Sequence, residues 1–446
     1  MSFPAGFLWG ASTSAYQIEG AIHEDGRGVS IWDQFVTEPG RIANGDTGEV
    51  AVDHYHRMPE DVELMAELGL SAYRFSIAWP RILPEGKGKP NQAGIDFYSR
   101  LVDALLEKGI EPVATLYHWD LPVQLFDAGG WRSRETAYAF ADYAEVMARA
   151  LGDRVRWWVT HNEPWCTAYL GYVTGIHAPG YVNETQAAID VSHHLLLSHG
   201  LAMPRIQAQT PGARVGIALN LFPVFAGDQR PETARATQRA DRFHNRWFVD
   251  PLFRGEYPAE LFNDLNVAPP PIKDGDMELI SAPMGFLGVN YYSRWMVTAG
   301  DEPRSIDYVK DLPADAVTEM GWEVYPHGLD ITLEELARKY HPTAILVTEN
   351  GAAFTDEWNG NGHVADARRV NYLRDHLAAV ERAIEHGAPV AGYFVWSLMD
   401  NFEWAEGYAR RFGVIYVDFA TQRRIVKDSG RWYAGFIAGQ RALEPR

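Results

Sequence analysis

The sequence predicts a single (β/α)₈ barrel domain that spans residues 1–446. Short, almost continuously apolar segments recur along the chain, and longer segments between them carry apolar residues at helical spacing. No low-complexity tract, internal repeat or long linker divides the chain. Strands that alternate with helices in one unbroken chain favour a closed parallel barrel. The alternative is a doubly wound sheet, but no GxGxxG motif follows the first candidate strand.

Eight segments are expected to form the barrel strands. Each is short and apolar at nearly every position, which is typical of parallel strands that are buried on both faces. They are centred on residues 8–10, 72–75, 113–116, 157–159, 215–218, 286–289, 345–347 and 393–395.

Three of the intervening segments have a clear helical pattern. Apolar residues recur at spacings of three and four, and a glycine follows each pattern as a stop signal. These segments cover residues 95–106, 140–151 and 370–384. The stretch from Tyr291 to Pro342 is long and irregular, so we expect it to form loops over the mouth of the barrel.

The overall composition disfavours several kinds of partner. The chain has 40 basic and 59 acidic residues, a formal charge of −19, and an acidic surface repels the phosphates of nucleic acids. The N-terminus lacks a basic region followed by an apolar stretch, and the longest apolar run is too short to span a membrane. We therefore expect a cytoplasmic protein that binds neither nucleic acid nor membrane, with a homo-oligomer left open.

Polar residues follow the predicted strands where a barrel would bring them together. In such barrels the residues just past the carboxyl ends of the strands converge on one site. The residues in question are His118-Trp119-Asp120, His161-Asn162-Glu163-Pro164, Asn290-Tyr291-Tyr292, Thr348-Glu349-Asn350-Gly351 and the segment from Trp396 to Trp404. Aromatic residues make up 13% of the chain, and aromatic faces stack on sugar rings, so carbohydrate is a mild favourite as ligand.

Two of these residues, Glu163 and Glu349, have the chemistry that glycoside hydrolysis needs. One carboxylate attacks the anomeric carbon, while the other donates a proton to the leaving oxygen and then activates water. A single glutamate at a strand end is commonly a member of a structural ion pair. The presence of two, accompanied by Asn162, Trp396 and Trp404, favours catalysis. Carboxyls about 5–5.5 Å apart would indicate a retaining mechanism.

Five motifs in order resemble those of glycoside hydrolase family 1, the β-glucosidase family. The resemblance extends from Phe7 to about Tyr433. The matching segments are Phe7-Leu8-Trp9-Gly10-Ala11-Ser12 through Gly20, Tyr73-Arg74-Phe75-Ser76-Ile77-Ala78-Trp79-Pro80-Arg81, Asn162-Glu163-Pro164, Thr348-Glu349-Asn350-Gly351, and Trp396 to Trp404.

The resemblance implies a role for each matched position. Glu349 would form the covalent glycosyl–enzyme intermediate, and Glu163 would be the acid/base, with a pKa raised by the negative charge of Glu349. Supporting residues would be Arg74, Asn162, Asn290 and Tyr292. Sugar-binding residues would be Gln17, His118, Trp119, Trp396, Glu403 and Trp404. Residues on the aglycone side would be Trp165, Leu170 and Trp322, although Trp165 and Leu170 could instead only fill the core.

The implied activity is release of non-reducing terminal β-D-glucosyl residues from cellobiose, short β-glucans and aryl or alkyl β-glucosides. A carboxylate at Glu403 would repel a 6-phosphate. Two alternatives stay open, namely the same fold and mechanism with a β-galactoside or β-fucoside preference, and a non-catalytic sugar-binding barrel. No cofactor is implied.

Other candidate features have structural interpretations. The histidines at Asp53-His54-Tyr55-His56 and His193-His194 lack a third ligand at a telling spacing, so no metal is expected. Cys166 is the only cysteine, which excludes an internal disulfide, and it is interpreted as a small packed residue near the pocket.

Overall fold

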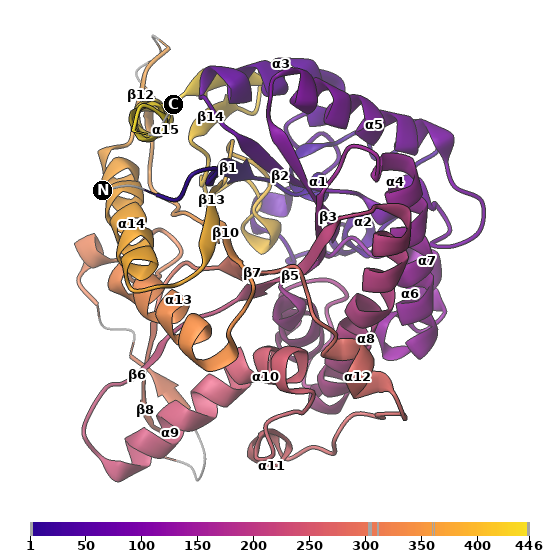
Figure 1. Ribbon diagram of the computed structural model, residues 1–446, viewed down its shortest axis with the longest axis vertical. Helices are drawn as coiled ribbons and strands as arrows, with labels where there is room; N and C mark the ends of the chain where they lie inside the picture. The colour runs from indigo at the N-terminus through magenta and orange to yellow at the C-terminus, as the bar shows by residue number, and fades with distance from the viewer. Residues whose placement is uncertain (1–2, 302–305, 310–311, 359, 361, 444–446) are drawn as a thin grey trace.

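Eight parallel strands form a closed barrel at the centre of the molecule (Figure 1). The computed structural model describes residues 3–301, 306–309, 312–358, 360 and 362–443. Neighbouring strands follow the order β1-β13-β10-β7-β5-β4-β3-β2, and β1 pairs with both β2 and β13 to close the ring. The barrel strands are β1 (Leu8–Ser12), β2 (Ala72–Ser76), β3 (Glu111–Tyr117), β4 (Trp157–Asn162), β5 (Arg214–Asn220), β7 (Phe286–Asn290), β10 (Ile345–Asn350) and β13 (Val390–Trp396). Every predicted strand centre lies within one of them, so the predicted barrel is confirmed.

Helices surround the barrel on its outer side (Figure 1). The longer ones are α3 (His54–Glu67), α5 (Gln92–Glu107), α7 (Arg134–Leu151), α8 (Thr185–Gln209), α9 (Pro231–Asp241), α10 (Trp247–Arg254), α13 (His327–Tyr340), α14 (Ala367–Glu385) and α15 (Asp428–Arg441). The three predicted helical segments correspond to α5, α7 and α14. In each, the apolar stripe faces inward because residues three and four apart share one face of a helix.

Short elements complete the chain. The short helices are α1 (Ala15–Ile18), α2 (Ile31–Phe35), α4 (Trp79–Ile82), α6 (Val123–Asp127), α11 (Leu261–Leu265) and α12 (Asp276–Ile280), with π-helical turns at Cys166–Thr174 and Arg242–Arg246. The short strands are β6 (Val224–Ala226), β8 (Trp295–Ala299), β9 (Ile306–Tyr308), β11 (Glu357–Trp358), β12 (Val364–Ala365), β14 (Ile415–Asp418) and β15 (Arg423–Val426). Single 3₁₀ turns lie at Ala43–Gly45, Gly130–Arg132, Ala314–Ala316 and Trp404–Glu406.

The expectation for Tyr291 to Pro342 is wrong in part. Strand β8 pairs with β6 on one side and with β9 on the other in a small sheet, and α13 is a regular helix that leads into β10. The helix forms because Leu329, Leu333 and Leu336 share one face and are buried. Residues 302–305 and 310–311 of this stretch lie outside the described residues.

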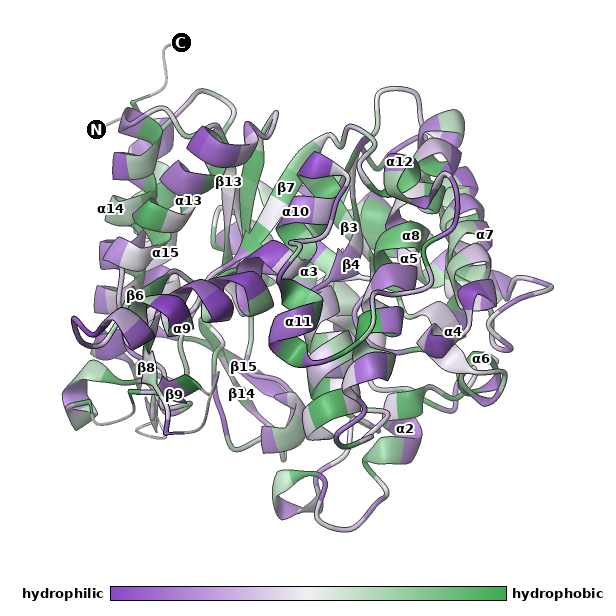
Figure 2. Ribbon diagram, turned by 90° about the horizontal axis from the view of Figure 1, so that it is seen from below, coloured by the Kyte–Doolittle hydropathy of each residue, from purple (hydrophilic) through white to green (hydrophobic). Residues whose placement is uncertain are grey.

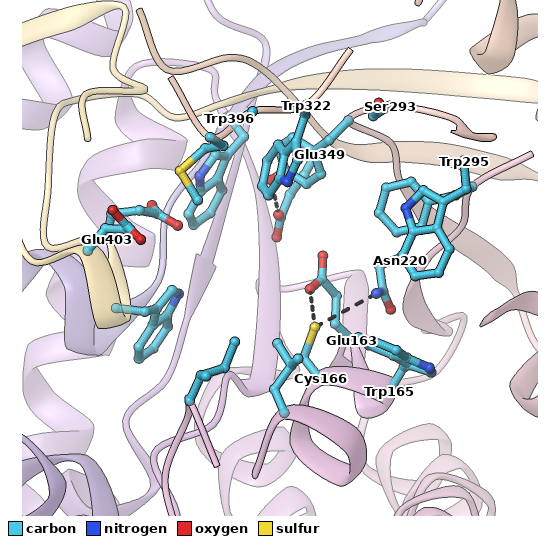
Figure 3. A pocket seen from close by; sticks show the side chains of 18 of the residues that line it. Glu163, Trp165, Cys166, Asn220, Ser293, Trp295, Trp322, Glu349, Trp396 and Glu403 are labelled. Atoms are coloured by element: carbon cyan, nitrogen blue, oxygen red, sulfur yellow. Dashed lines mark hydrogen bonds between the residues drawn. The ribbon is translucent and has the colours of Figure 1, made fainter. Parts of the chain in front are cut away.

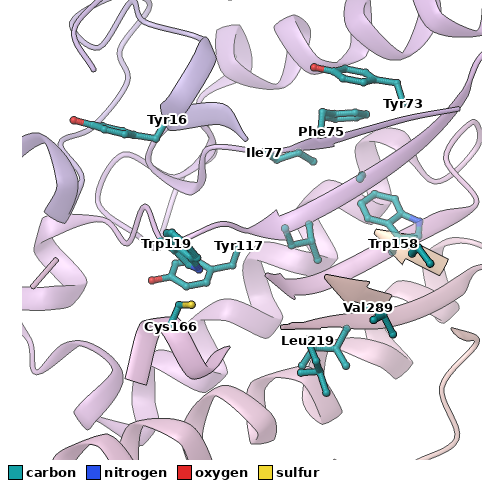
Figure 4. Packing of buried hydrophobic residues seen from close by; sticks show 14 of the residues in the cluster. Tyr16, Tyr73, Phe75, Ile77, Tyr117, Trp119, Trp158, Cys166, Leu219 and Val289 are labelled. Carbon is teal, nitrogen blue, oxygen red and sulfur yellow. The ribbon is translucent and has the colours of Figure 1, made fainter. Parts of the chain in front are cut away.

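Side chains on the strands alternate between two apolar layers. One cluster fills the barrel interior and includes Ala72, Val113 and Phe394. A larger cluster lies between the barrel and the helices and includes Tyr73 and Phe75 (Figure 4). Since successive residues of a strand point to opposite sides, Arg74 faces the barrel interior while its neighbours face the helices.

The hydropathy pattern agrees with this layering, because hydrophobic residues concentrate on the strands and the inner faces of the helices (Figure 2). The hairpin β14–β15 and the sheet that contains β8 lie at the same end of the barrel (Figure 2). Within the described residues, no helix is long and apolar enough to cross a membrane.

Candidate active site

A cavity of about 770 Å³ opens at the carboxyl ends of the barrel strands (Figure 3). Most of the predicted site residues line it, namely His118, Trp119, Asn162, Glu163, Trp165, Leu170, Tyr292, Trp322, Glu349, Trp396, Glu403 and Trp404. The other predicted residues, Gln17, Arg74 and Asn290, are fully buried behind the wall and hydrogen-bond to residues that line it. The topology therefore brings all the predicted positions together.

Glu349 lies near the end of β10, and both of its carboxyl oxygens are held. Arg74 Nη1 on β2 donates to Oε1 at 2.6 Å, and the Tyr292 hydroxyl donates to Oε2 at 2.5 Å. Burial raises the pKa of Glu349, while the Arg74 charge and the Tyr292 hydrogen bond oppose that rise. These two partners favour the ionised carboxylate, which is the form able to act as a nucleophile.

Glu163 is the first residue after β4, and its environment favours the protonated form. Its backbone has a φ of 47°, in the left-handed region, and its N–H donates to the Ala218 carbonyl of β5 at 2.9 Å. Asn290 Nδ2 donates to Oε1 at 2.7 Å and the Cys166 thiol donates to Oε2 at 3.0 Å. Burial, followed by the negative charge of Glu349, raises the pKa of Glu163 to about 7.

Asn162 links the two carboxyls to His118. Its Oδ1 accepts from Arg74 Nη2 at 2.6 Å and from Asn290 Nδ2 at 3.0 Å, so its Nδ2 is the group 3.0 Å from His118 Nε2. Nε2 therefore accepts, and the imidazole hydrogen lies on Nδ1. Burial lowers the pKa of His118, which keeps the ring neutral. Nδ1 is buried and has no hydrogen-bond partner among the described residues.

A third carboxyl, Glu403, lies at another edge of the cavity. Gln17 Nε2 donates to its Oε2 at 3.3 Å and also to the Phe402 carbonyl at 2.8 Å. Burial, followed by the charges of Glu349 and Glu163, raises the pKa of Glu403 to about 8. A carboxyl with a pKa of about 8 carries its proton through most of the neutral range. Hydroxyl groups that donate to it would lower its pKa again.

Aromatic rings form the walls around these polar groups. Trp404 and Trp119 lie 4.6 Å apart between ring centroids, and Trp396 stacks against His118 at 6.0 Å. Trp119 and Trp404 have φ values of 81° and 48°. Left-handed backbone at bulky residues is strained and recurs at functional sites. The walls therefore provide flat apolar surfaces beside hydrogen-bonding groups, an arrangement suited to a sugar ring.

Another side of the cavity is lined mainly by apolar and aromatic residues. Trp165 and Leu170 both lie on the cavity wall. Trp322 packs against Tyr292 at 5.2 Å between ring centroids. Trp165 also packs against His244 at 4.7 Å, so it contributes to the core as well.

Several lining residues were not predicted from the sequence. Phe222 and Trp295 stack at 5.7 Å between ring centroids on the apolar side, and Asn220 contacts Cys166. Phe222 lies two residues after the end of β5, so the rule applied to the other strand ends could have found it. The contact of Cys166 with Glu163 has no signal in the sequence, because it depends on how the turn after β4 folds.

A histidine of each motif forms a hydrogen bond with a buried carboxylate. His54 hydrogen-bonds to Asp61 at 2.7 Å, and His193 hydrogen-bonds to Asp276 at 3.0 Å. Over the described part of the chain, no group of three His, Cys, Asp or Glu side chains could hold a metal ion.

Comparisons with known proteins agree with this geometry. The model of Glycosyl hydrolase family 1 matches residues 1–442. A 1,4-β-D-glucan glucohydrolase of Thermotoga neapolitana is 47% identical over 98% of this chain and 98% of its own length. β-Glucosidase A of Acetivibrio thermocellus is 46% identical over 98% of both chains. The structure of a Thermotoga maritima β-glucosidase in complex with glucoimidazole has a TM-score of 0.95 at 46% identity, covering 98% of this chain and 99% of that one.

Proposed function

Because this chain belongs to glycosyl hydrolase family 1, we propose that it removes the terminal β-D-glucosyl residue from β-glucosides with retention of configuration. The observation that carries the proposal is the pair Glu163 and Glu349 on one cavity. Arg74 favours the ionised form of Glu349, whereas burial and the charge of Glu349 favour the protonated form of Glu163. Relatives 46–47% identical over nearly the whole chain are named as a β-glucosidase and a β-glucan glucohydrolase. Cellobiose, short β-glucans and aryl or alkyl β-glucosides are the proposed substrates.

In the first step, the Glu349 carboxylate attacks the anomeric carbon while Glu163 transfers its proton to the glycosidic oxygen. The bond from carbon to the leaving oxygen breaks, the alcohol leaves neutral, and a glycosyl ester forms on Glu349. Arg74 supports this step because it holds Glu349 ionised through the 2.6 Å hydrogen bond. The neutral form of Glu163 supports it because the departing oxygen needs a proton.

In the second step, Glu163 takes a proton from water and the water oxygen attacks the same carbon. Formation of the ester removes the negative charge of Glu349, which had raised the pKa of Glu163. Glu163 therefore becomes ionised at the stage where a base is needed. Two inversions give a product with the configuration of the substrate, and Glu349 returns to its ionised form.

The polar end of the cavity is the proposed sugar site. His118, Asn162 and Glu403 line this end and would meet the hydroxyls, with Gln17 behind Glu403, and Trp396 offers a flat face to the ring. The apolar side, with Trp165, Leu170, Trp322 and the unpredicted Phe222 and Trp295, would accept the aglycone. Flat aromatic walls suit both an aryl group and a second glucose unit.

The test is the configuration of the first sugar released from a nitrophenyl β-glucoside, followed by proton NMR before mutarotation. Retention predicts β-glucose, and α-glucose would exclude the double displacement. A panel of nitrophenyl β-glucoside, β-galactoside and β-fucoside compares the sugars that differ at the 4- and 6-positions. The largest kcat/KM is expected for the glucoside, and no hydrolysis of any of them would point to the non-catalytic barrel.

A further inference from the structure

The single cysteine of the chain lies against the proposed acid/base (Figure 3). Cys166 begins the π-helical turn Cys166–Thr174, and its backbone N–H donates to the Glu163 carbonyl at 2.9 Å. Its Sγ lies 3.0 Å from Glu163 Oε2 and donates to it. The side chain is 6% exposed and borders the cavity. A thiol hydrogen thus meets the carboxyl that would exchange a proton with the substrate.

Asn220 determines which way the thiol points. This residue ends β5, and its Nδ2 donates to Cys166 Sγ at 3.7 Å. Sulfur is a weak acceptor, so the contact contributes mainly orientation. Burial and the charge of Glu163 raise the pKa of the Cys166 thiol well above its usual value, so the sulfur keeps its hydrogen. With one side of the sulfur facing the Asn220 amide, the S–H bond is directed at Glu163.

Asn290 holds the other oxygen of the same carboxyl. Its Nδ2 donates to Glu163 Oε1 at 2.7 Å, and its Oδ1 accepts from the Thr348 hydroxyl at 2.6 Å, which fixes the amide orientation. Oε1 therefore always faces an N–H donor. The proton of the acid form must lie on Oε2, which is the oxygen that contacts Cys166.

We propose that Cys166, oriented by Asn220, is a positioning residue that keeps the Oε2 proton of Glu163 available to the substrate. The inference rests on the proposed acid/base role of Glu163. Because the sulfur already accepts from Asn220 and donates its own hydrogen, it does not capture the Oε2 proton. Once that proton has been transferred, the thiol hydrogen stabilises the carboxylate that remains.

Other charged and titratable groups also face Glu163. Glu349 on β10 and Glu403 after β13 disfavour its ionisation, while Arg74 on β2 favours it. Tyr292, which follows β7, donates its hydroxyl hydrogen to Glu349. Cys166 and Asn290 are thus the two neutral donors that contact Glu163 itself, and removal of the thiol should make its ionisation harder.

The first experiment compares the pH dependence of kcat/KM on phenyl β-glucoside for wild type, Cys166→Ala, Cys166→Ser and Thr167→Val. Phenolate is a poor leaving group, so the alkaline limb reports the loss of the Glu163 proton. Cys166→Ala should move this limb upward by about half a pH unit, the size expected for a weak hydrogen bond. Cys166→Ser keeps a donor and should stay within about 0.2 units of wild type. Thr167→Val, a buried neighbour in the same turn, should leave the limb unchanged.

Coincident limbs for wild type and Cys166→Ala would overturn the proposal. An equal shift in Cys166→Ala and Cys166→Ser would also overturn it, because packing rather than donation would then be the cause. Thermal unfolding of each variant confirms that the comparison is made on folded protein.

A second experiment needs no substrate. The chain has one cysteine, so its infrared S–H stretching band arises from Cys166 alone. The band should move to lower frequency as pH rises through about 7 and Glu163 ionises, and Glu163→Gln should abolish this movement. A pH-independent band in wild type would refute the thiol contact. If the band responds to pH but the wild type releases no phenol from phenyl β-glucoside, the proposed function is refuted and the thiol contact is not.

Discussion

Arg74 and Tyr292 hold the two oxygens of Glu349, whereas an amide and a thiol hold those of Glu163. A guanidinium favours a negative charge far more than neutral donors do. The two glutamates therefore differ in proton affinity although both are deeply buried. This difference between single side chains underlies the proposed roles of nucleophile and acid/base, and each role can be tested separately.

Replacement of Glu163 by Ala should separate the two chemical steps. Dinitrophenolate leaves without a proton, so a dinitrophenyl β-glucoside should give a burst of phenol followed by slow turnover, because no base activates water. For phenyl β-glucoside, kcat/KM should fall by about 10²–10⁴-fold. Azide should restore turnover and give the β-glycosyl azide.

Glu349→Ala is the matched variant for this experiment. It should show no burst, and azide should give the α-product because attack comes directly from the vacated face. The α-azide from Glu163→Ala together with the β-azide from Glu349→Ala would mean that the two roles are reversed.

The pH profile of the wild type follows from the pKa of about 7 for Glu163. Glu163 must be protonated for the first step, so kcat/KM on cellobiose should fall as pH rises through about 7. On the acid side, activity should fall where Glu349 becomes protonated, above the ordinary pKa of a glutamate because burial raises it. Initial rates between acidic and alkaline pH measure both limbs. If kcat/KM stays constant up to pH values far above that pKa, the assignment of Glu163 as the acid/base is contradicted.

Glu403 should determine selection between neutral and phosphorylated sugars. Glu403→Ala leaves the bound hydroxyls without a partner. Binding of the transition state should weaken by about 2–3 kcal/mol, and kcat/KM should fall accordingly. Glu403→Gln should lose less, because an amide can also accept and donate. A wild-type preference for a 6-phosphoglucoside over the neutral glucoside would show that the substrate assignment is wrong.

At the scale of whole elements, the sequence predicted the strands and three helices, because their patterns are complete within one segment. The apolar stripe of α5 and the apolar residues of β10 can be recognised from their own sequence, without knowledge of the elements that pack against them. Helix α13 was missed, because the preceding irregular stretch obscured the stripe of Leu329, Leu333 and Leu336. The candidate site residues were identified through motifs at the strand ends, whereas the contact of Cys166 with Glu163 depends on the folded turn after β4.

A buried ion network ties the C-terminal elements to the loop that carries Glu403. Lys427 Nζ, between β15 and α15, donates to Asp400 at 2.7 Å and to Asp356 at 2.5 Å. Lys427→Met should destabilise the fold by about 3–5 kcal/mol, because two buried carboxylates lose a partner. The control Lys339→Met breaks a surface pair with Glu335 and should change stability by less than about 0.5 kcal/mol. Urea unfolding measures both, and equal small effects would show that the network contributes little.

At the scale of the whole molecule, the carboxyls of the cavity should lower stability at alkaline pH. A carboxyl whose pKa is raised by folding binds more protons in the folded than in the unfolded state, so stability falls as pH rises between the two pKa values. For Glu163 this interval extends from the ordinary glutamate range to about 7, and for Glu403 to about 8. The cavity therefore holds groups that favour catalysis at the expense of stability.

Glu163→Gln should accordingly be more stable than wild type at pH 8 by about 3 kcal/mol, with little difference at pH 4. The comparison of variant with wild type at each pH cancels the titration of all other groups. Denaturant melts at the two pH values test it. A stability difference that does not depend on pH would mean that Glu163 titrates normally in the folded protein.

The pairing of β1 with β13, from Leu8 beside Gly392 to Ser12 beside Trp396, joins the two ends of the chain. A ribosome makes about 5–20 residues each second, so the first strand waits for its partner for at least about twenty seconds. During that interval the ring is open, and β1 and β2 expose an edge able to pair with another nascent chain. Pairs so distant in sequence also form slowly. Yield of active enzyme in the cell should therefore depend on chaperones and translation speed more than on the stability of the finished protein.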